Sequence, residues 1–262
     1  MNYLPYLKWH AECEGTAGLI DSIGALNFTE QNGVGESVGI IGNARDFPAA
    51  NDAFQRAADA SGPFDLRSQS VDKMTFCGWY KADSISGAQV FAEQTGTTEG
   101  EKAWAMTAVW KLASNFGFAF SLRDNTGPQW RTILAPAAGL ATYPTGEWCF
   151  VGGSVSIAAD IWSVWLYTQS QGQHFETYQG LMAGLNLPFD YSTLGVTWIG
   201  QNASGGSIGT GGMLGDADQL DMFHGIAFKR KDVRHFWNKG RGRVWPNGYR
   251  SKTQGQPYYF AA

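Results

Sequence analysis

The stretch LGDADQLDMFHGIAFKRKDVRHFWNKGRG, Leu214–Gly242, decides the fold. Its first part predicts a strand over Leu214–Asp218, a turn with alternating acids, and a second strand over Gln219–Phe228 that is rich in large apolar residues. From Lys229–Asp232 onward the apolar spacing changes from two to about 3.6 residues, which predicts a short polar helix that ends at Gly240. A closing strand followed by a trailing helix is typical of a β-sandwich, and no residue of the stretch belongs to a catalytic pattern.

Length and composition favour one all-β domain. A chain of 262 residues fits a single large β domain better than two small ones. The 34 glycines, the aromatic content of 14% and the charged content of only 16% indicate many short strands joined by tight turns. The net charge of -4 is spread along the chain without a basic patch, so we expect no nucleic-acid partner.

The cysteines and the N-terminus indicate where the chain is made. Cys13, Cys77 and Cys149 are too few for a disulfide framework and show no zinc spacing, so we expect buried reduced thiols. Met1–Glu12 has no basic segment followed by an apolar run, and no window approaches the ~18 apolar residues of a membrane helix. We therefore expect synthesis in the cytoplasm without a signal peptide, and no membrane partner.

Five landmarks follow one another in an order that is typical of one family. Each consists of a short strand with its turn, and together they extend from about Tyr6 to Arg243. They are Trp9–Glu12 with Gly18–Ser22, Gly42–Phe47 with Asn51–Phe54, Met74–Lys81, Gly146–Trp148 with Val151, and Leu214–Asp218 with Asn238–Gly240. In this order they resemble the LamG-like jelly roll of the concanavalin A-like lectin/glucanase superfamily, which includes the pentraxins.

The resemblance implies an all-β fold. We expect a two-sheet antiparallel jelly-roll β-sandwich with a short C-terminal helix over residues 1–242, followed by an extended C-terminal arm over residues 243–262. Within the sandwich, both faces of Lys73–Lys81 are apolar, which predicts a central strand covered on each side. The arm is polar and ends in Tyr258, Tyr259 and Phe260. Because free termini normally fray, we expect these aromatic residues to be held by neighbours in an assembly.

The catalytic patterns of the superfamily are missing. Its glucanases carry Glu, Asp and Glu at alternate positions of a strand, so that all three face the sugar. The nearest match here is Asp216-x-Asp218, with Leu220 in the third place. Gly205–Gly209 spells Gly-x-Ser-x-Gly, but Thr210–Gly212 cannot form the helix that a nucleophile elbow requires. We expect no catalytic residues and no enzyme, while a glycoside hydrolase with atypical acid spacing stays an alternative.

Calcium is the one metal that the resemblance raises. Related jelly rolls hold it with acids on loops at one rim, because hard cations take carboxylate and carbonyl oxygens. Asn51 and Asp52 lie where pentraxins place a pair of calcium ligands, whereas Gln201–Gly212, the region of the second ligand loop, contains no carboxylate. Calcium at Asn51 and Asp52 is therefore a candidate, with a capped turn as the alternative. No other cofactor is expected.

Aromatic residues near strand ends are the candidates for sugar binding. A ring stacks on the apolar side of a pyranose, and polar groups beside it bond the hydroxyls. The chain has 11 Trp, more than a core of this size needs. The candidates are Trp104, Trp130, Tyr143 and Trp245, and for each of them burial against a neighbour is the alternative.

These observations predict a non-catalytic binding or assembly module. A lone domain from a family usually found on secreted proteins, without an export signal and with an extra arm, favours a virion structural protein of a bacteriophage. Its place would be capsid decoration or a fibre or tail-associated position that exposes a lectin-like surface. The expected partners are other virion proteins, further copies of the chain and cell-surface glycans. A bacterial carbohydrate-binding lectin is the alternative.

Overall fold

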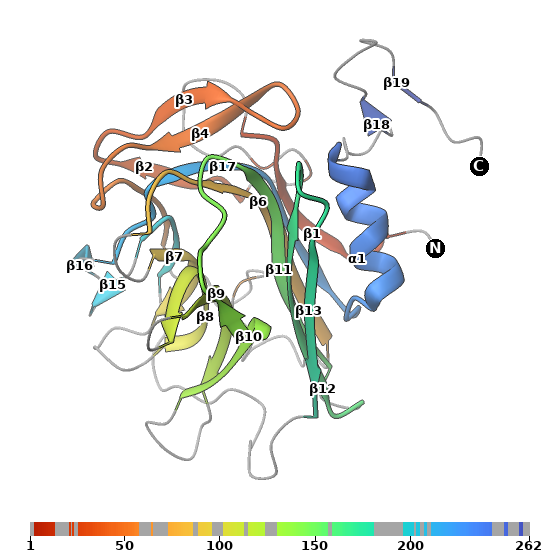
Figure 1. Ribbon diagram of the computed structural model, residues 1–262. Coiled ribbons are helices and arrows are strands. Elements are labelled where there is room, and N and C mark those ends of the chain that lie inside the picture. The colour runs from red at the N-terminus through yellow and green to blue at the C-terminus, as the bar shows by residue number, and fades with distance from the viewer. Residues whose placement is uncertain are drawn as a thin grey trace.

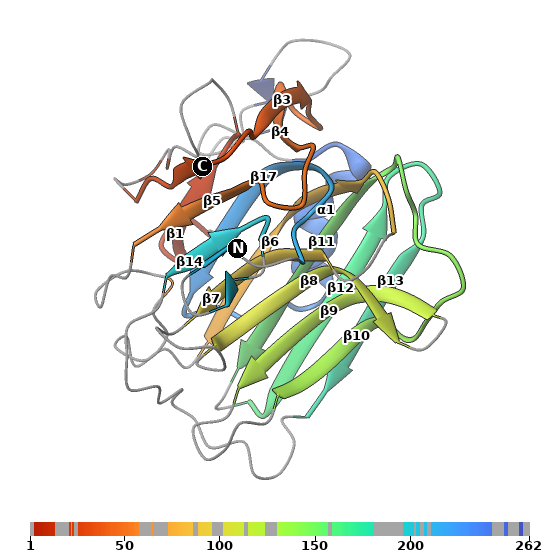
Figure 2. The ribbon, with the colours of Figure 1, turned by 90° about the vertical axis from the view of Figure 1, so that its left-hand side faces the viewer.

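Two antiparallel β-sheets lie face to face in the computed structural model, and one helix covers the outer face of the first sheet (Figure 1; Figure 2). The structure describes residues 3–13, 21, 23, 26–57, 64, 73–85, 89–95, 102–112, 115–123, 130–156, 159–180, 196–201, 203–204, 207–208, 211–242, 249–250 and 257–258. The arrangement confirms the predicted all-β sandwich with a short helix near its C-terminal end.

The first sheet has eight strands in the order β13-β12-β11-β6-β17-β4-β3, and β1 pairs with β17 beside this path. Its strands are β1 (Leu7–Ala11), β3 (Gly35–Val38), β4 (Asn43–Phe47), β6 (Lys73–Ala82), β11 (Trp148–Ser156), β12 (Ile161–Thr168), β13 (His174–Gln179) and β17 (Gly215–His224). The central position of β6, with its almost completely buried side chains, confirms the strand predicted over Lys73–Lys81.

The second sheet has seven strands in the order β10-β9-β8-β7-β14-β5-β2. They are β2 (Thr29–Gln31), β5 (Ala53–Arg56), β7 (Gln89–Thr95), β8 (Lys102–Leu112), β9 (Asn115–Arg123), β10 (Trp130–Leu140) and β14 (Thr197–Ile199). Two short pairs stand apart from both sheets, namely β15 (Ala203–Ser204) with β16 (Ser207–Ile208) and β18 (Tyr249–Arg250) with β19 (Pro257–Tyr258).

The stretch Leu214–Phe228 differs from its prediction. Gly215–His224 forms a single strand, β17, where the sequence predicted two strands around a turn, and Gly225–Phe228 lies beyond the end of this strand. A bulge between Asp218 and Asp221 interrupts the pairing with β6, and Gln219 has a φ of 51°. A bulge adds a residue to one strand without ending it, so the acidic positions stay inside the sheet. The predicted helix is confirmed as α1 (Arg230–Trp237), which a 3-10 turn, η1 (Asn238–Gly240), extends.

An aromatic core fills the space between the two sheets. The rings of Phe76 and Trp104 lie 5.7 Å apart, and those of Phe120 and Trp162 lie 6.2 Å apart, so each pair joins opposite sheets. Gly153 on β11 gives room for the second pair, because a Cβ there would lie 2.5 Å from the ring of Phe120. Close packing of large rings therefore fixes the distance between the layers.

A second core lies between the first sheet and α1. Phe236 of α1 stacks on Phe228 at 4.7 Å, and Phe228 stacks on Trp165 of β12 at 6.2 Å. Gly152 of β11 lies under Trp165, where a Cβ would come within 2.5 Å of that ring. The first sheet is thus buried on both faces, which explains why every position of β11 is buried.

We expect Gly152→Ala to lower the free energy of unfolding by about 1–3 kcal/mol, because the added methyl group would overlap Trp165 and the neighbouring strand β6. Urea denaturation followed by tryptophan fluorescence measures this change. Gly180→Ala is the matched control, since a Cβ at that exposed glycine meets only ordinary contacts with Asp160. Equal stability losses in the two variants would contradict the packing argument.

Candidate functional site

A cavity of about 240 Å³ lies where the chain passes from β17 to α1. Three lysines, one tyrosine and the loop between the two elements form its walls, and we call it the lysine cavity. Its lining residues are Tyr6, Lys73, Gly225, Ile226, Ala227, Lys229, Lys231 and Asp232. These residues come from the start, the middle and the end of the domain, so only the folded chain brings them together.

Two backbone hydrogen bonds hold Tyr6 and Lys73 next to the end of β17. The N–H of His224 donates to the carbonyl of Tyr6 at 2.9 Å, and the N–H of Gly225 donates to the carbonyl of Lys73 at 2.8 Å. Gly225 has a φ of 77°, and a Cβ on it would lie 3.3 Å from the ring of Tyr6. Glycine at this position therefore allows both the turn and the close approach of the Tyr6 ring. Tyr6 remains 36% exposed.

The loop that forms the floor is bonded to the sheet below it. Thr75 donates its hydroxyl to the carbonyl of Ile226 at 3.0 Å, and the N–H of Phe228 donates to the hydroxyl of Ser154 at 3.0 Å. Thr75 and Ser154 are themselves joined, 2.7 Å apart. Because these bonds connect the loop to β6 and β11, the cavity has a preformed shape.

Positive charge dominates the lining. Lys229 and Lys231 are exposed, Lys73 is half-buried, and the single acid of the lining is Asp232. The carboxylate of Asp232 is buried and accepts hydrogen bonds from the hydroxyl of Tyr3 at 2.7 Å and from the N–H of Lys229 at 2.9 Å. The carboxylate therefore already holds the first turn of α1, and the described residues of the lining include three lysines and this one acid.

Chemically, the cavity is suited to binding. Lysine ammonium groups only donate hydrogen bonds, and the face of a tyrosine ring packs on apolar surface. Glycoside hydrolysis needs two carboxyl groups on opposite sides of the bond to be cut. Among the described residues that line the cavity, Asp232 is the only acid.

Two of the four predicted sugar-binding aromatics are core residues. Trp104 is 0% exposed, packs on Phe76 and donates its indole N–H to the carbonyl of Phe64 at 3.4 Å. Tyr143 is 1% exposed. Neither ring offers a face to solvent, so the prediction that they stack on a sugar is wrong, and the alternative of burial holds for both. Trp130 begins β10 with a side chain outside the described part of the structure, and Trp245 lies outside the described residues.

Asn51 and Asp52, the predicted calcium pair, lie in a turn that is held by hydrogen bonds. The buried carboxylate of Asp52 accepts hydrogen bonds from the N–H of Gly33 at 3.0 Å and of Ala49 at 2.7 Å. The carbonyl of Asn51 accepts a hydrogen bond from the side-chain amide of Asn32. Within the described ranges no three metal-binding side chains come together. Calcium at this pair stays a prediction.

The aromatic tip of the arm is described only in part. Tyr258 belongs to β19 and pairs through its backbone with Tyr249 of β18, while Tyr259 and Phe260 lie outside the described residues. The predicted role of the three residues in assembly therefore stays a prediction.

Sequence reasoning missed the lysine cavity. Lys229 and Lys231 belong to the stretch that decided the fold, but they were assigned only to the start of a polar helix. The useful signal was the run Lys229-Arg230-Lys231 next to a strand end. Tyr6 and Lys73 gave no local signal, because only the pairing of β17 with β6 and with the chain before β1 places them there.

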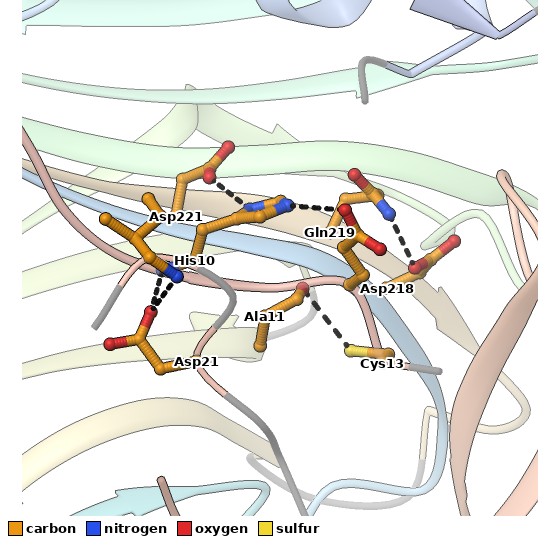
Figure 3. A network of polar contacts seen from close by, with 9 residues as sticks. His10, Ala11, Cys13, Asp21, Asp218, Gln219 and Asp221 are labelled. Carbon is orange, nitrogen blue, oxygen red and sulfur yellow. Dashed lines mark hydrogen bonds and ion pairs between the residues drawn. The ribbon is translucent and has the colours of Figure 1, made fainter. Parts of the chain in front are cut away.

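A separate network of polar side chains is buried beside the bulge of β17 (Figure 3). His10 Nδ1 lies 2.7 Å from the carboxylate of Asp221, and His10 Nε2 lies 3.8 Å from Glu12. The N–H of His10 donates to Asp21 at 3.2 Å, which ties β1 to the following loop. His10 is 0% exposed, so no substrate reaches this histidine-aspartate pair, and its role is structural.

The acids of the Asp216-x-Asp218 landmark are also structural. Asp218 is buried and accepts hydrogen bonds from the N–H groups of Ile40 and Ile41 at 2.8 and 3.1 Å. Asp216 pairs with Lys81 and accepts a hydrogen bond from the hydroxyl of Ser37 at 2.5 Å. Both side chains therefore fix the β3–β4 hairpin on β17.

The fold is an all-β sandwich, and the cavity lies at its surface beside α1. No protein-family model matches the chain, and no curated protein matches its sequence. Solved structures do match. The CBM40 of the Ruminococcus gnavus IT-sialidase, bound to alpha2,3 sialyllactose, is similar with a TM-score of 0.54 and 11% identity over 73% of this chain and 95% of that one.

Two longer chains are similar as well. A structure of botulinum neurotoxin type C, whose cell entry depends on interaction with two ganglioside molecules, matches with a TM-score of 0.55 and 10% identity over 90% of this chain and 52% of that one. Tailspike protein 2 of Escherichia coli O157:H7 bacteriophage CAB120 matches with a TM-score of 0.54 and 14% identity over 82% of this chain and 27% of that one. The chain thus spans about half or less of these two relatives, and at these identities the likeness shows the fold alone.

Hydropathy adds one finding on membranes. Among the helices that the structure describes, none has the length and apolar character needed to span a bilayer.

The buried network makes stability depend on pH. Burial lowers the pKa of His10, but the charge and hydrogen bond of Asp221, together with Glu12, outweigh it and raise this pKa to about 9. Because the folded pKa lies above the unfolded one, the stabilisation is complete below pH ~6.5 and is lost as pH rises through 9. We expect the free energy of unfolding to fall by about 3 kcal/mol across this window, measured by urea denaturation at stepped pH.

Asp218 contributes to the pH dependence of stability in a lower pH range than His10. Burial raises the pKa of Asp218 to about 8, so the stability that it contributes is lost as pH rises from about 4 through 8. His10→Gln should flatten the decline above pH 8, and Asp218→Asn should flatten the part below it. An unchanged decline above pH 8 in His10→Gln would contradict the assignment to His10.

Proposed function

We propose that the protein is a non-catalytic carbohydrate-binding module that takes a sugar in the lysine cavity. The observation that carries this proposal is the preformed lining, which contains Tyr6 together with lysines from the start of β6 and the start of α1. A ring face and nearby polar groups are what a pyranose requires for stacking and for hydrogen bonding of its hydroxyls.

The solved structures of similar fold support the proposal. One is a carbohydrate-binding module in complex with a sialylated sugar, and another belongs to a toxin that interacts with gangliosides. Fold does not confer function, so the proposal rests on the cavity, and the neighbours show that such sandwiches are used in this way.

The non-catalytic character follows from the placement of the acids. Asp216 and Asp218, the nearest match to the acid pattern of the glucanases, hold the β3–β4 hairpin. Asp232 stands alone in the lining and is bonded to Tyr3. A glycosidase would need a second carboxyl group across the cavity, about 5–9.5 Å away.

Tyr6→Ala should weaken sugar binding by about 1 kcal/mol, roughly fivefold, because the stacking face is lost. Tyr6→Phe should keep most of the affinity. A glycan array identifies the ligand, and isothermal titration calorimetry of the variants measures the change. Val38→Ala is the control, since Val38 is the most exposed of the large apolar residues, at 73%, and is not in the lining.

EDTA tests whether sugar binding depends on calcium at the predicted pair Asn51 and Asp52. Binding should be unchanged by EDTA, because the cavity is lined by lysines and only one acid. Loss of sugar binding in EDTA, with no effect of Tyr6→Ala, would move the site to the predicted calcium pair Asn51 and Asp52. Absence of binding to every glycan would overturn the proposal.

We also propose that the module is displayed on a bacteriophage particle, as capsid decoration or on a fibre or tail. The observation that favours this role is the similarity to part of a phage tailspike chain. Other virion proteins and further copies of the chain would be its partners, and the segment 243–262 would supply contacts. A bacterial lectin acting away from any particle is the alternative.

Quantitative mass spectrometry of purified particles tests the virion role. A decoration protein should be present at a multiple of the capsid symmetry, and a fibre protein at a few copies. Finding the chain in the soluble fraction alone, with none on particles, would favour the bacterial lectin.

A further inference from the structure

We infer that the lysine cavity selects a sugar that carries a negative charge, such as a carboxylate, over a neutral sugar. This inference rests on the proposed carbohydrate-binding function and names the class of ligand. Three observations carry it, namely the kind of groups in the lining, their origin on separate elements, and the size of the cavity.

Among the described side chains of the lining, hydrogen-bond donors outnumber acceptors. Lys73, Lys229 and Lys231 contribute ammonium groups, each of which donates up to three hydrogen bonds and accepts none. The carboxylate of Asp232 already accepts from Tyr3 and from the N–H of Lys229. A neutral sugar has hydroxyls that both donate and accept, and among these described side chains only the Tyr6 hydroxyl and the Asp232 carboxylate can accept from it. An anionic group accepts only, and its hydrogen bonds to ammonium groups are strengthened by charge.

The three lysines come from two places in the fold, the start of β6 and the start of α1. Lys73 begins β6, where its carbonyl accepts a hydrogen bond from the N–H of Gly225, while Lys229 precedes α1 and Lys231 lies in its first turn. A bound anion would lie near these positively charged residues and would be attracted by them. Arg230, between two of these lysines in sequence, pairs with Glu176 of β13 and is not part of the lining.

The volume limits the ligand to about one sugar ring. The cavity holds about 240 Å³. Small-molecule sites typically enclose about 300–1,000 Å³, so a drug-sized molecule or an oligosaccharide would not be enclosed. The cavity therefore fits one acidic ring at the end of a glycan.

Isothermal titration calorimetry of the full chain with glucuronate and with glucose tests the charge directly, because the two sugars differ only in a carboxylate against a hydroxymethyl group. N-acetylneuraminic acid is a second acidic probe, and acetate and inorganic phosphate are the anions without a sugar. We expect an acidic sugar to bind at least tenfold more tightly than glucose. We also expect its affinity to fall several-fold between about 0.05 and 0.5 M salt, since salt screens exposed charges.

Lys73→Gln, Lys229→Gln and Lys231→Gln should each weaken binding of the acidic sugar several-fold and leave binding of glucose unchanged. Lys239→Gln is the matched control, because it removes the same charge from an exposed lysine of η1 that is not in the lining. Unchanged urea midpoints of the variants establish that they are folded.

Each outcome separates this inference from the function on which it rests. Equal binding of acidic and neutral sugars, with an effect of Tyr6→Ala but none of the lysine variants, would overturn the inference and leave carbohydrate binding intact. Binding of acetate or phosphate as tight as that of the acidic sugars would show a plain anion site and would also overturn it. Absence of binding to any sugar would overturn both.

Discussion

Burial of the first sheet on both faces is the constraint on which the rest of the structure depends. One face packs on the second sheet through rings such as Phe76 and Trp104, and the other packs on α1 through Trp165 and Phe228. The face toward α1 carries large apolar side chains, whose burial is favourable. The helix therefore has to return across the sheet, and the lysine cavity lies where that return begins.

The same constraint explains the polar residues of β17. Four acidic or amide side chains of this strand are buried, and the contacts of Asp216, Asp218 and Asp221 join β17 to the β3–β4 hairpin, to β6 and to β1. The acids that resemble a family landmark thus hold neighbouring segments in register. This assignment leaves the surface near α1, and not the acid-rich strand, as the place where the molecule offers groups to a ligand.

Sequence patterns predicted those elements whose signal is local. The two apolar faces of Lys73–Lys81 and the 3.6-residue spacing before Gly240 gave β6 and α1, because periodicity is a property of neighbouring residues. The bulge was missed, since a positive φ at Gln219 has no signature in a residue other than glycine. Trp104 was predicted to bind sugar because it lies near a strand end. Its side chain is nevertheless buried, since position along a strand does not determine burial. The cavity was missed because its lining joins residues that only the sheet order brings together.

The lining of the cavity spans the domain from Tyr6 to Asp232. Its walls exist only after β1, β6 and β17 have paired and α1 has docked, which are contacts between segments far apart in the chain. A ligand held there binds the native state and no partly assembled intermediate, so it stabilises the native state by mass action. A bound ligand would consequently hold the first and last segments of the domain together and would slow the local unfolding of either segment.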